Sequence, residues 1–441
     1  MTVLIKIAQF VVSLSILVII HEFGHFLMAK LFKTRVEKFY LFFDPWFSLF
    51  KIKKGETEYG VGWLPLGGYV KISGMIDESL DREQLKKPPE PWEFRSKPSW
   101  QRLLIMTGGV LFNFILAFLI YVAVLYAWGE TYLPTANAKY GIVTDSTGHA
   151  LGLRDGDKIL SVDGQYIENF NEITADILLN DRKTIQVDRD GNEVEIQITR
   201  DYIKNALKGF GHIEARVPFK PFVVSSFMKK SPAKEAGLQV NDEIVGLDGH
   251  TFRYYDEYQK YLSENKGRPI LLNILRNDTE VSASVKPDNK GMFRVAIRNV
   301  HHLELKTVRY GLLKSVPAGM EKGIKMIGDY LKQFKLLFSK DTKAYESLGG
   351  FITIGRIFPE VWDWEAFWNL TAFLSIILAV MNILPIPALD GGHVMFLLFE
   401  VVTGRKPSDK FLEYAQIAGM IILISLLLFA NGNDIVKLFR K

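Results

Sequence analysis

The segment that decides the fold is Val18-Ile19-Ile20-His21-Glu22-Phe23-Gly24-His25-Phe26-Leu27-Met28. It extends an uncharged apolar run over residues 7–21 and is followed by Lys30. The run reaches the roughly 20 residues that cross a bilayer only if the histidines and the glutamate belong to the same helix. Ionisable groups inside an apolar segment are energetically costly and by default mark a functional site. The segment therefore predicts a membrane helix that carries chemistry.

Three further uncharged runs are long enough to cross a membrane unaided. They lie at residues 103–129, 366–389 and 414–433. We expect a polytopic α-helical membrane protein with four transmembrane helices, at residues 1–30, 103–129, 366–393 and 414–433. The alternative for residues 1–20 is a cleaved signal peptide, with Lys6 in its charged region. It is disfavoured because no small-residue cleavage site precedes His21 and the apolar pattern continues past that residue.

The composition of the 441 residues excludes several classes of function. Lys and Arg number 54 against 49 Asp and Glu, and the net charge of +5 gives no reason to expect a nucleic-acid partner. The mean hydropathy of +0.09 is the average of lipid-like runs and charged, soluble segments. Because the chain has no cysteine, disulfide scaffolds and Cys-ligated metals are excluded. Any metal must bind to histidine and carboxylate side chains.

The basic residues predict how the spans are oriented. Those that follow the first span and precede the second place the loop at 31–102 on the cytoplasmic side by the positive-inside rule. Arg405, Lys406 and Lys410 after the third span agree, whereas Lys437, Arg440 and Lys441 in the tail at 434–441 argue the other way. We expect the helix segment at His21 to face the cytoplasm and both termini to face outward.

Outside the spans, the sequence predicts two kinds of β structure. The loop at 31–102 has alternating runs and a Gly67-Gly68 pair before a strand-like segment, which predicts hairpins. Its high apolar content leaves two interpretations, a membrane-associated hairpin region or an ordinary small sheet. A repeat at 152–164 recurs at 237–249, an offset of 85 residues, and predicts two related β-rich domains at 130–215 and 216–300. Residues 301–365 are expected to form an amphipathic connector, and residues 394–413 a cytoplasmic loop.

The histidine spacing predicts a zinc site. His21 and His25 lie on one helical face, and two imidazoles can then share one zinc, with Glu22 placed to take a proton from the attacking water. A protease zinc requires a third ligand. Asp390 is favoured because it ends the third apolar run, and His393 remains a competitor. Prolines 385 and 387 interrupt that run, which lipid tolerates only where the freed backbone faces protein or a wet cavity.

With these motifs, the chain resembles the site-2 proteases, which are intramembrane zinc metalloproteases, and among them the bacterial regulators of the envelope-stress sigma factor. The resemblance covers the whole length and rests on His-Glu-Phe-Gly-His, on Asn-x-x-Pro-x-Pro-x-Leu-Asp-Gly-Gly-His from Asn382, and on the paired PDZ-like repeats. It implies one Zn²⁺ per chain, bound by His21, His25 and Asp390, with Glu22 as catalytic base. It also implies a bacterial inner-membrane location, with the PDZ-like domains on the periplasmic side.

The resemblance further implies residues that bind substrate. Asn113 and Asn382 would hold the substrate or the transition state, and the hairpin region would pair with the unwound substrate helix. The other candidates for substrate contact are Pro385, Pro387, Gly67 and Gly68. At Asn113 the chain departs from the family, because the run before it is Gly108-Gly109-Val110-Leu111-Phe112 and lacks the usual proline.

The sequence thus predicts hydrolysis of peptide bonds within the transmembrane segments of single-span proteins. The PDZ-like domains would bind peptides or act as a size filter that admits trimmed substrates. The alternative is a catalytically inactive membrane scaffold whose PDZ-like domains recruit partners. The two functions diverge at Glu22, which only the protease requires.

Overall fold

The structure is a computed structural model that describes residues 2–75, 88–288, 291–298, 302–337 and 349–439. Two compact units make up the chain. One unit contains residues 1–130, 309–335 and 345–441, and the other contains residues 131–308 and 336–344. The expected apolar runs all lie in the first unit, and the two β-rich repeats lie in the second.

Four helices of the described chain are long and apolar enough to cross a membrane. They are α1 (Thr2–Leu31), α3 (Ser99–Ala127), α11 (Trp364–Ile383) and α13 (Asp409–Phe439). The third span differs from the continuous helix expected at 366–393. It ends at Ile383, and a separate helix, α12 (Asp390–Thr403), begins after the segment that contains the two prolines. Proline removes a backbone donor and clashes with the preceding turn, so the helix stops there.

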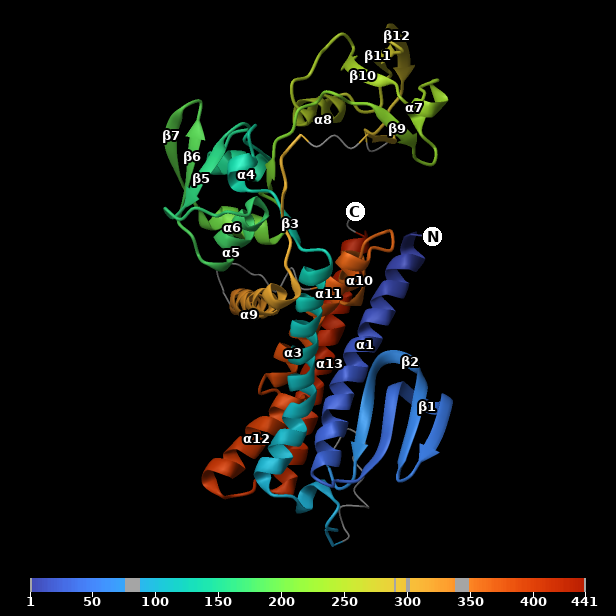
Figure 1. Cartoon of the computed structure of the whole chain (residues 1–441), viewed down its shortest axis with the longest axis vertical. Helices are drawn as coiled ribbons and strands as arrows, with labels where there is room; N and C mark the ends of the chain where they lie inside the picture. Colours follow the sequence, from blue (N-terminus) through green and yellow to red (C-terminus); the bar gives the residue numbers. More distant parts are fainter. Residues whose placement is uncertain (1, 76–87, 289–290, 299–301, 338–348, 440–441) are drawn as a thin grey trace. The chain divides into compact units, whose positions relative to one another are not determined.

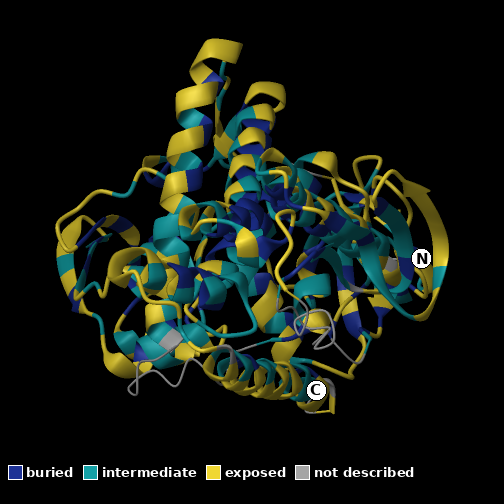
Figure 2. Ribbon diagram, turned by 90° about the horizontal axis from the view of Figure 1, so that it is seen from below, coloured by how far each residue is buried: buried dark blue, intermediate teal, exposed yellow. Residues whose placement is uncertain are grey.

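The other described helices of this unit, besides α12, are η1 (Phe94–Ser96), α9 (Leu312–Leu337) and α10 (Phe351–Ile357). Helix α9 falls within the connector expected at 301–365, and its exposed side chains include Leu313 and Ile324. Exposed yellow faces run along many of the helices in Figure 2. Apolar side chains on such faces are expected where lipid, rather than water, surrounds a helix.

Small residues bring α1 and α3 into close contact. A Cβ atom placed on Gly24 of α1 would overlap the carbonyl oxygen of Gly108 in α3. Polar contacts join the same helices to α11, because Thr371 donates to Ser13 Oγ at 3.0 Å and Ser375 donates to the carbonyl oxygen of Asn113 at 2.7 Å. Interfaces of this kind hold helices together in lipid, where apolar burial supplies little driving force.

The loop between α1 and α3 forms a sheet from two long, bent strands, β1 (Val36–Lys54) and β2 (Thr57–Ile72). Their register is double. Residues 38–41 pair with 58–61 on one side and with 68–71 on the other, and residues 50–54 pair with 57–61. The register of residues 38–41 against 58–61 runs parallel, and the other pairings are antiparallel. The sheet therefore has four arms, in the order 48–54, 57–62, 36–43 and 68–72. The last arm is an edge.

The second unit contains two modules with matching sheets. The first module has sheets β5-β6-β7 and β4-β8, and the second has β10-β11-β12 and β9-β13, all antiparallel. The strands are β3 (Glu130–Tyr132), β4 (Ile142–Thr144), β5 (Lys158–Val162), β6 (Thr184–Arg189), β7 (Asn192–Gln197), β8 (Ile213–Ala215), β9 (Val224–Phe227), β10 (Glu243–Leu247), β11 (Ile270–Arg276), β12 (Thr279–Val285), β13 (Val295–Ile297) and β14 (Lys306–Val308). The helices are η2 (Thr135–Asn137), α4 (Ser146–Leu151), η3 (Phe170–Glu172), α5 (Ile173–Leu179), α6 (Arg200–Leu207), α7 (Pro232–Glu235) and α8 (Tyr255–Glu264).

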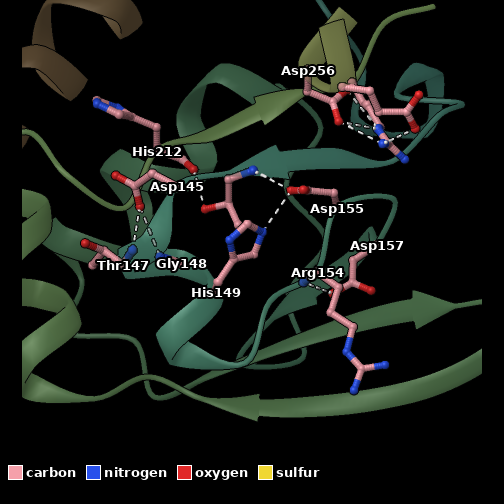
Figure 3. Close-up of polar contacts among 12 residues, drawn as sticks. Asp145, Thr147, Gly148, His149, Arg154, Asp155, Asp157, His212 and Asp256 are labelled. Atoms are coloured by element: carbon pink, nitrogen blue, oxygen red, sulfur yellow. Dashed lines mark hydrogen bonds and ion pairs between the residues drawn. The ribbon is translucent and has the colours of Figure 1, made fainter. Parts of the chain in front are cut away.

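Aspartates of the repeat hold each module's turns. Asp157 is 1% exposed and binds Arg189 through both carboxylate oxygens, at 2.8 and 2.7 Å. Asp242, at the equivalent position, binds Arg276 at 2.7 Å through each oxygen. Figure 3 shows another aspartate of the first module, Asp145, accepting hydrogen bonds from the first backbone amides of α4. The repeat motif is therefore a structural device.

Candidate metal centre

The structure brings His21, His25 and Asp390 together. The two histidines lie one turn apart in α1, and Asp390 is the first residue of α12. The distance between the two Nε2 atoms is 3.3 Å, and Asp390 Oδ2 lies 3.1 Å from that of His21 and 3.2 Å from that of His25. Within the described residues, these donor atoms form a group that could hold a metal ion.

The spacing of the three donor atoms fits zinc. Four ligands at about 2.0–2.1 Å from a tetrahedral centre lie roughly 3.3 Å from one another, which is close to the three distances found. Asp390 Oδ2 is buried and makes no hydrogen bond in the described structure, although both imidazoles are near. A buried carboxylate oxygen without a hydrogen bond is costly unless a cation is present. The residues therefore fit a zinc ion with one open coordination position.

Helix α3 orients both imidazoles. His25 Nδ1 lies 2.9 Å from the carbonyl oxygen of Ile105, so Nδ1 carries the proton and Nε2 is free to bind a metal. His21 Nδ1 lies 3.3 Å from the side-chain amide of Asn113, which is fully buried. A histidine that binds a metal through Nε2 donates a hydrogen bond from Nδ1, so the atom of Asn113 at this contact should be the amide oxygen. The nitrogen and oxygen of a side-chain amide are nearly equal in size, and a 180° flip of the amide group exchanges them. That exchange also gives a partner to Asn113 Oδ1, which otherwise has none.

Gly109 makes room for the imidazoles. A Cβ atom on this residue would overlap His25 Nε2 and lie 2.6 Å from His21 Cε1. Sequence reasoning did not assign a role to Gly109. The available signal was the pair Gly108-Gly109 within an otherwise bulky apolar helix. Gly108 packs against Gly24 of α1, and Gly109 lies against the metal-binding face.

A cavity of about 500 Å³ opens beside the three donor atoms. His21, Glu22, His25 and Asp390 line it on one side, and the edge arm of the sheet, residues 68–72, lines it on the other. Gly68 is at the contact between the two sides, because a Cβ atom there would lie 2.6 Å from Val18 Cγ1 and 3.5 Å from Glu22 Cγ. Gly67 lies beside the ring of Phe43, further from the helix.

The segment between α11 and α12 shapes the other side of the site. Asn382, in the last turn of α11, places its side-chain nitrogen 3.3 Å from His21 Nε2. Ala388 adopts a left-handed backbone conformation, with φ of 78°, which is strained for a residue with a side chain. Pro387 packs against Gly419 of α13. The two prolines interrupt the helix, and neither is among the residues that line the cavity.

His393 does not join the metal group. It lies on α12 and lines a different cavity, with Phe94 and Glu400. The competition between Asp390 and His393 that the sequence left open is therefore decided in this structure by which side chain lies near the histidines of α1.

Comparison with known proteins assigns the family. Residues 9–426 match the sequence model of Peptidase family M50. The chain belongs to this family. It is 27% identical to the regulator of sigma-E protease RseP of Salmonella typhimurium (strain 14028s), over 99% of this chain and 100% of that protein. It is also 28% identical to protease RseP of Yersinia pestis and to the putative zinc metalloprotease PM1991 of Pasteurella multocida, again over 99% of this chain and 100% of each. A solved structure, the PDZ domain of the SdrC-like protein from Listeria innocua, is 27% identical, with a TM-score of 0.17, and covers 19% of this chain and 99% of that one.

Membership of family M50 makes the protein a zinc metalloprotease of the site-2 type, with Zn²⁺ as its cofactor. Its function is regulated intramembrane proteolysis, and nothing in the comparisons favours the inactive scaffold. Together with the four apolar helices, the relatives indicate a multi-pass inner-membrane protein.

Proposed function

We propose that this M50 protease cleaves single-span membrane proteins within their transmembrane segment, with His21, His25 and Asp390 holding the zinc and Glu22 as the catalytic base. The observation that carries the proposal is the convergence of three buried donor atoms at zinc spacing, in a cavity that Glu22 also lines. The helical spacing of His21, Glu22 and His25 places the glutamate on the neighbouring face, beside the metal position.

When bound, zinc would polarise the scissile carbonyl and lower the pKa of water from 15.7 to about 7. Glu22 accepts the proton of the attacking water and returns it to the leaving amine. Asn382, beside His21 Nε2, is positioned to donate a hydrogen bond to the oxygen on which negative charge develops. Asn113 contacts His21 Nδ1 and orients that ligand, so its role at the substrate is indirect.

The edge arm of the sheet explains how a helical substrate becomes cleavable. A transmembrane helix hides its backbone in internal hydrogen bonds, so it must unwind before a protease can attack. Among the described residues, 68–72 pair with β1 on one side only, which leaves the other side able to add an extended strand. Since the same residues line the cavity beside Glu22, a strand added there would lie along the catalytic residues.

The proposal also includes the orientation of the protein in the membrane. The β1–β2 sheet and the metal centre would face the cytoplasm of a bacterial cell, with the two β-rich modules on the periplasmic side; the basic residues that flank the spans support this orientation. The modules would be PDZ-like domains that bind peptides or admit only trimmed substrates. Apolar side chains of the sheet, among them Trp46 and Phe50, are exposed, which supports its association with the membrane.

The test is Glu22→Gln in the full-length protein. We expect cleavage of a single-span reporter to fall by about 10²- to 10⁴-fold, because general-base catalysis is lost, while zinc stays near one per chain. A matched control is Glu360→Gln, since Glu360 is 69% exposed, does not line the metal cavity and should leave zinc content unchanged. Full cleavage by Glu22→Gln would rule out the proposed base.

A further inference from the structure

A second cavity lies in the membrane unit, between the start of α3, η1 and the ends of α12 and α13. Its volume is about 70 Å³. One water requires roughly 10–15 Å³ by such a measure, so the cavity can hold a group of several heavy atoms. The cationic residues that line it are Arg95, Arg102 and Lys406, against one carboxylate, Glu400. The metal-centre proposal uses none of these four residues.

Arg102 is unusual because it is buried at the end of a membrane span. Its side chain is 9% exposed, and it pairs with Glu400 of α12 through Nη2. Its Nε donates to the carbonyl oxygen of Lys97 at 3.0 Å. These contacts use two of the five N–H donors of a guanidinium. Burying a guanidinium whose N–H donors are only partly hydrogen-bonded costs free energy. That cost is reduced if an anion occupies the cavity that Arg102 lines.

The walls of the cavity are apolar. Phe94 and Leu397 are 8% and 6% exposed, and Met75, Phe396 and Leu412 complete the lining. Close by in sequence, Trp92 and Trp100 are 45% and 51% exposed, as is typical of aromatic side chains at the boundary between lipid and water. The site therefore combines cations, an apolar wall and a position at the edge of the hydrocarbon layer.

We propose that this cavity binds the phosphate of an anionic phospholipid headgroup. Guanidinium groups match the geometry of phosphate oxygens, and basic pockets between membrane helices are suited to lipid headgroups. The apolar lining accepts the glycerol and the first part of an acyl chain. Because the cavity includes His393 and Glu400 of α12, a bound headgroup contacts the helix that begins at Asp390, the proposed metal ligand.

The test compares the effects on lipid binding of substituting two adjacent basic residues, Arg405 and Lys406. Both Lys406 and Arg405 are exposed, and only Lys406 lines the cavity. Binding of a fluorescent phosphatidylglycerol to the full-length protein in neutral detergent is measured by polarisation. We expect Lys406→Gln to weaken binding about fivefold and Arg405→Gln to change it by less than twofold, since each nearby cation contributes roughly 1 kcal/mol. Zinc content and melting temperature without lipid serve as folding controls.

Two further measurements decide the source of the phosphate. Phosphatidylcholine, which has the same phosphate without net charge, should bind more weakly than phosphatidylglycerol. Inorganic phosphate at millimolar concentration should not displace the lipid, because it lacks the apolar part. Equal losses in Lys406→Gln and Arg405→Gln, no loss in either, or full displacement by inorganic phosphate would each overturn the proposal.

Discussion

The metal centre and the aspartate–arginine pairs of the β-rich modules are both clusters of ionisable side chains withdrawn from water. They differ in whether the hydrogen-bond acceptors of the cluster are paired with donors inside it. Asp242 accepts two hydrogen bonds from Arg276 and one from the backbone of Gln239. At the metal centre, Asp390 Oδ2 makes no hydrogen bond, and both imidazole Nε2 atoms lie beside it. A cluster that uses its own donors and acceptors supports a fold, whereas one whose acceptors converge on a single point binds a ligand.

The largest expected effect comes from removing a proposed ligand of the metal centre. Asp390→Ala should lower zinc affinity by more than about 100-fold, because even residues that only orient a ligand cost 10–100-fold. Zinc per chain after competition with a chelator measures the loss. Asp242→Ala is the control, since it removes a buried aspartate from the second unit, away from the metal centre, and should leave zinc bound. Equal zinc in the two variants would contradict the distinction between the clusters.

Gly109→Ala should have a smaller effect on the same centre. The added methyl group would overlap His25 Nε2, so the imidazoles must shift, and we expect zinc affinity to fall by about 10- to 100-fold. Gly432→Ala in α13 is the control, because a Cβ atom there meets nothing within 4 Å. Zinc titration of both variants checks the prediction, which fails if Gly109→Ala binds zinc as tightly as Gly432→Ala does.

Breaking the ion pair between Asp242 and Arg276 should destabilise the second module without changing the metal centre. Arg276→Ala leaves Asp242 buried without its cation and should destabilise the second module. Arg268→Ala removes a cation that is 54% exposed, and its cost should stay below about 1 kcal/mol. Hydrogen exchange of residues 243–285 in the full chain measures both. Zinc content should be the same in the two variants.

The pH dependence of the second module should be the smallest effect. Although burial favours the neutral acid, the hydrogen bonds from Arg276 and from the backbone of Gln239 hold the pKa of Asp242 below its usual value. This stabilisation is present above the ordinary aspartate pKa of about 3.9 and is lost as pH falls through the lower folded pKa. The protection factors of the amides of residues 243–285, which correct the exchange rate for its intrinsic dependence on pH, should therefore decrease below pH 4. Asp242→Asn should flatten that dependence, and an unchanged profile would contradict it.

Local patterns in the sequence predicted part of the site. The i, i+4 spacing placed His21 and His25 on one face of a helix, because a helix repeats every 3.6 residues. The position of Asp390 at the end of an apolar run favoured it as third ligand. The roles of Gly109 and Ile105 could not be predicted in this way, because they depend on the packing of α3 against α1. Ile105, for example, is 80 residues from His25 in the sequence.

The β structure, too, was predictable from the sequence only in part. Alternating runs predicted hairpins within residues 31–102, and an exact-offset repeat predicted two related modules. The double register of β1 and β2, which makes residues 68–72 an edge beside Glu22, was not predictable, because the alternation within each run does not specify which two segments flank residues 38–41.

By itself, the sequence determined the four apolar segments, the zinc-binding residue types and the repeat, since each depends on neighbours within a few turns. The tertiary structure decided the rest. It set which of Asp390 and His393 lies near the histidines, how α3 orients the two imidazoles, and that a second, cation-lined cavity is present at the other face of α12. These features arise from contacts between helices far apart in the chain, where close packing and the need to pair buried polar groups select one arrangement.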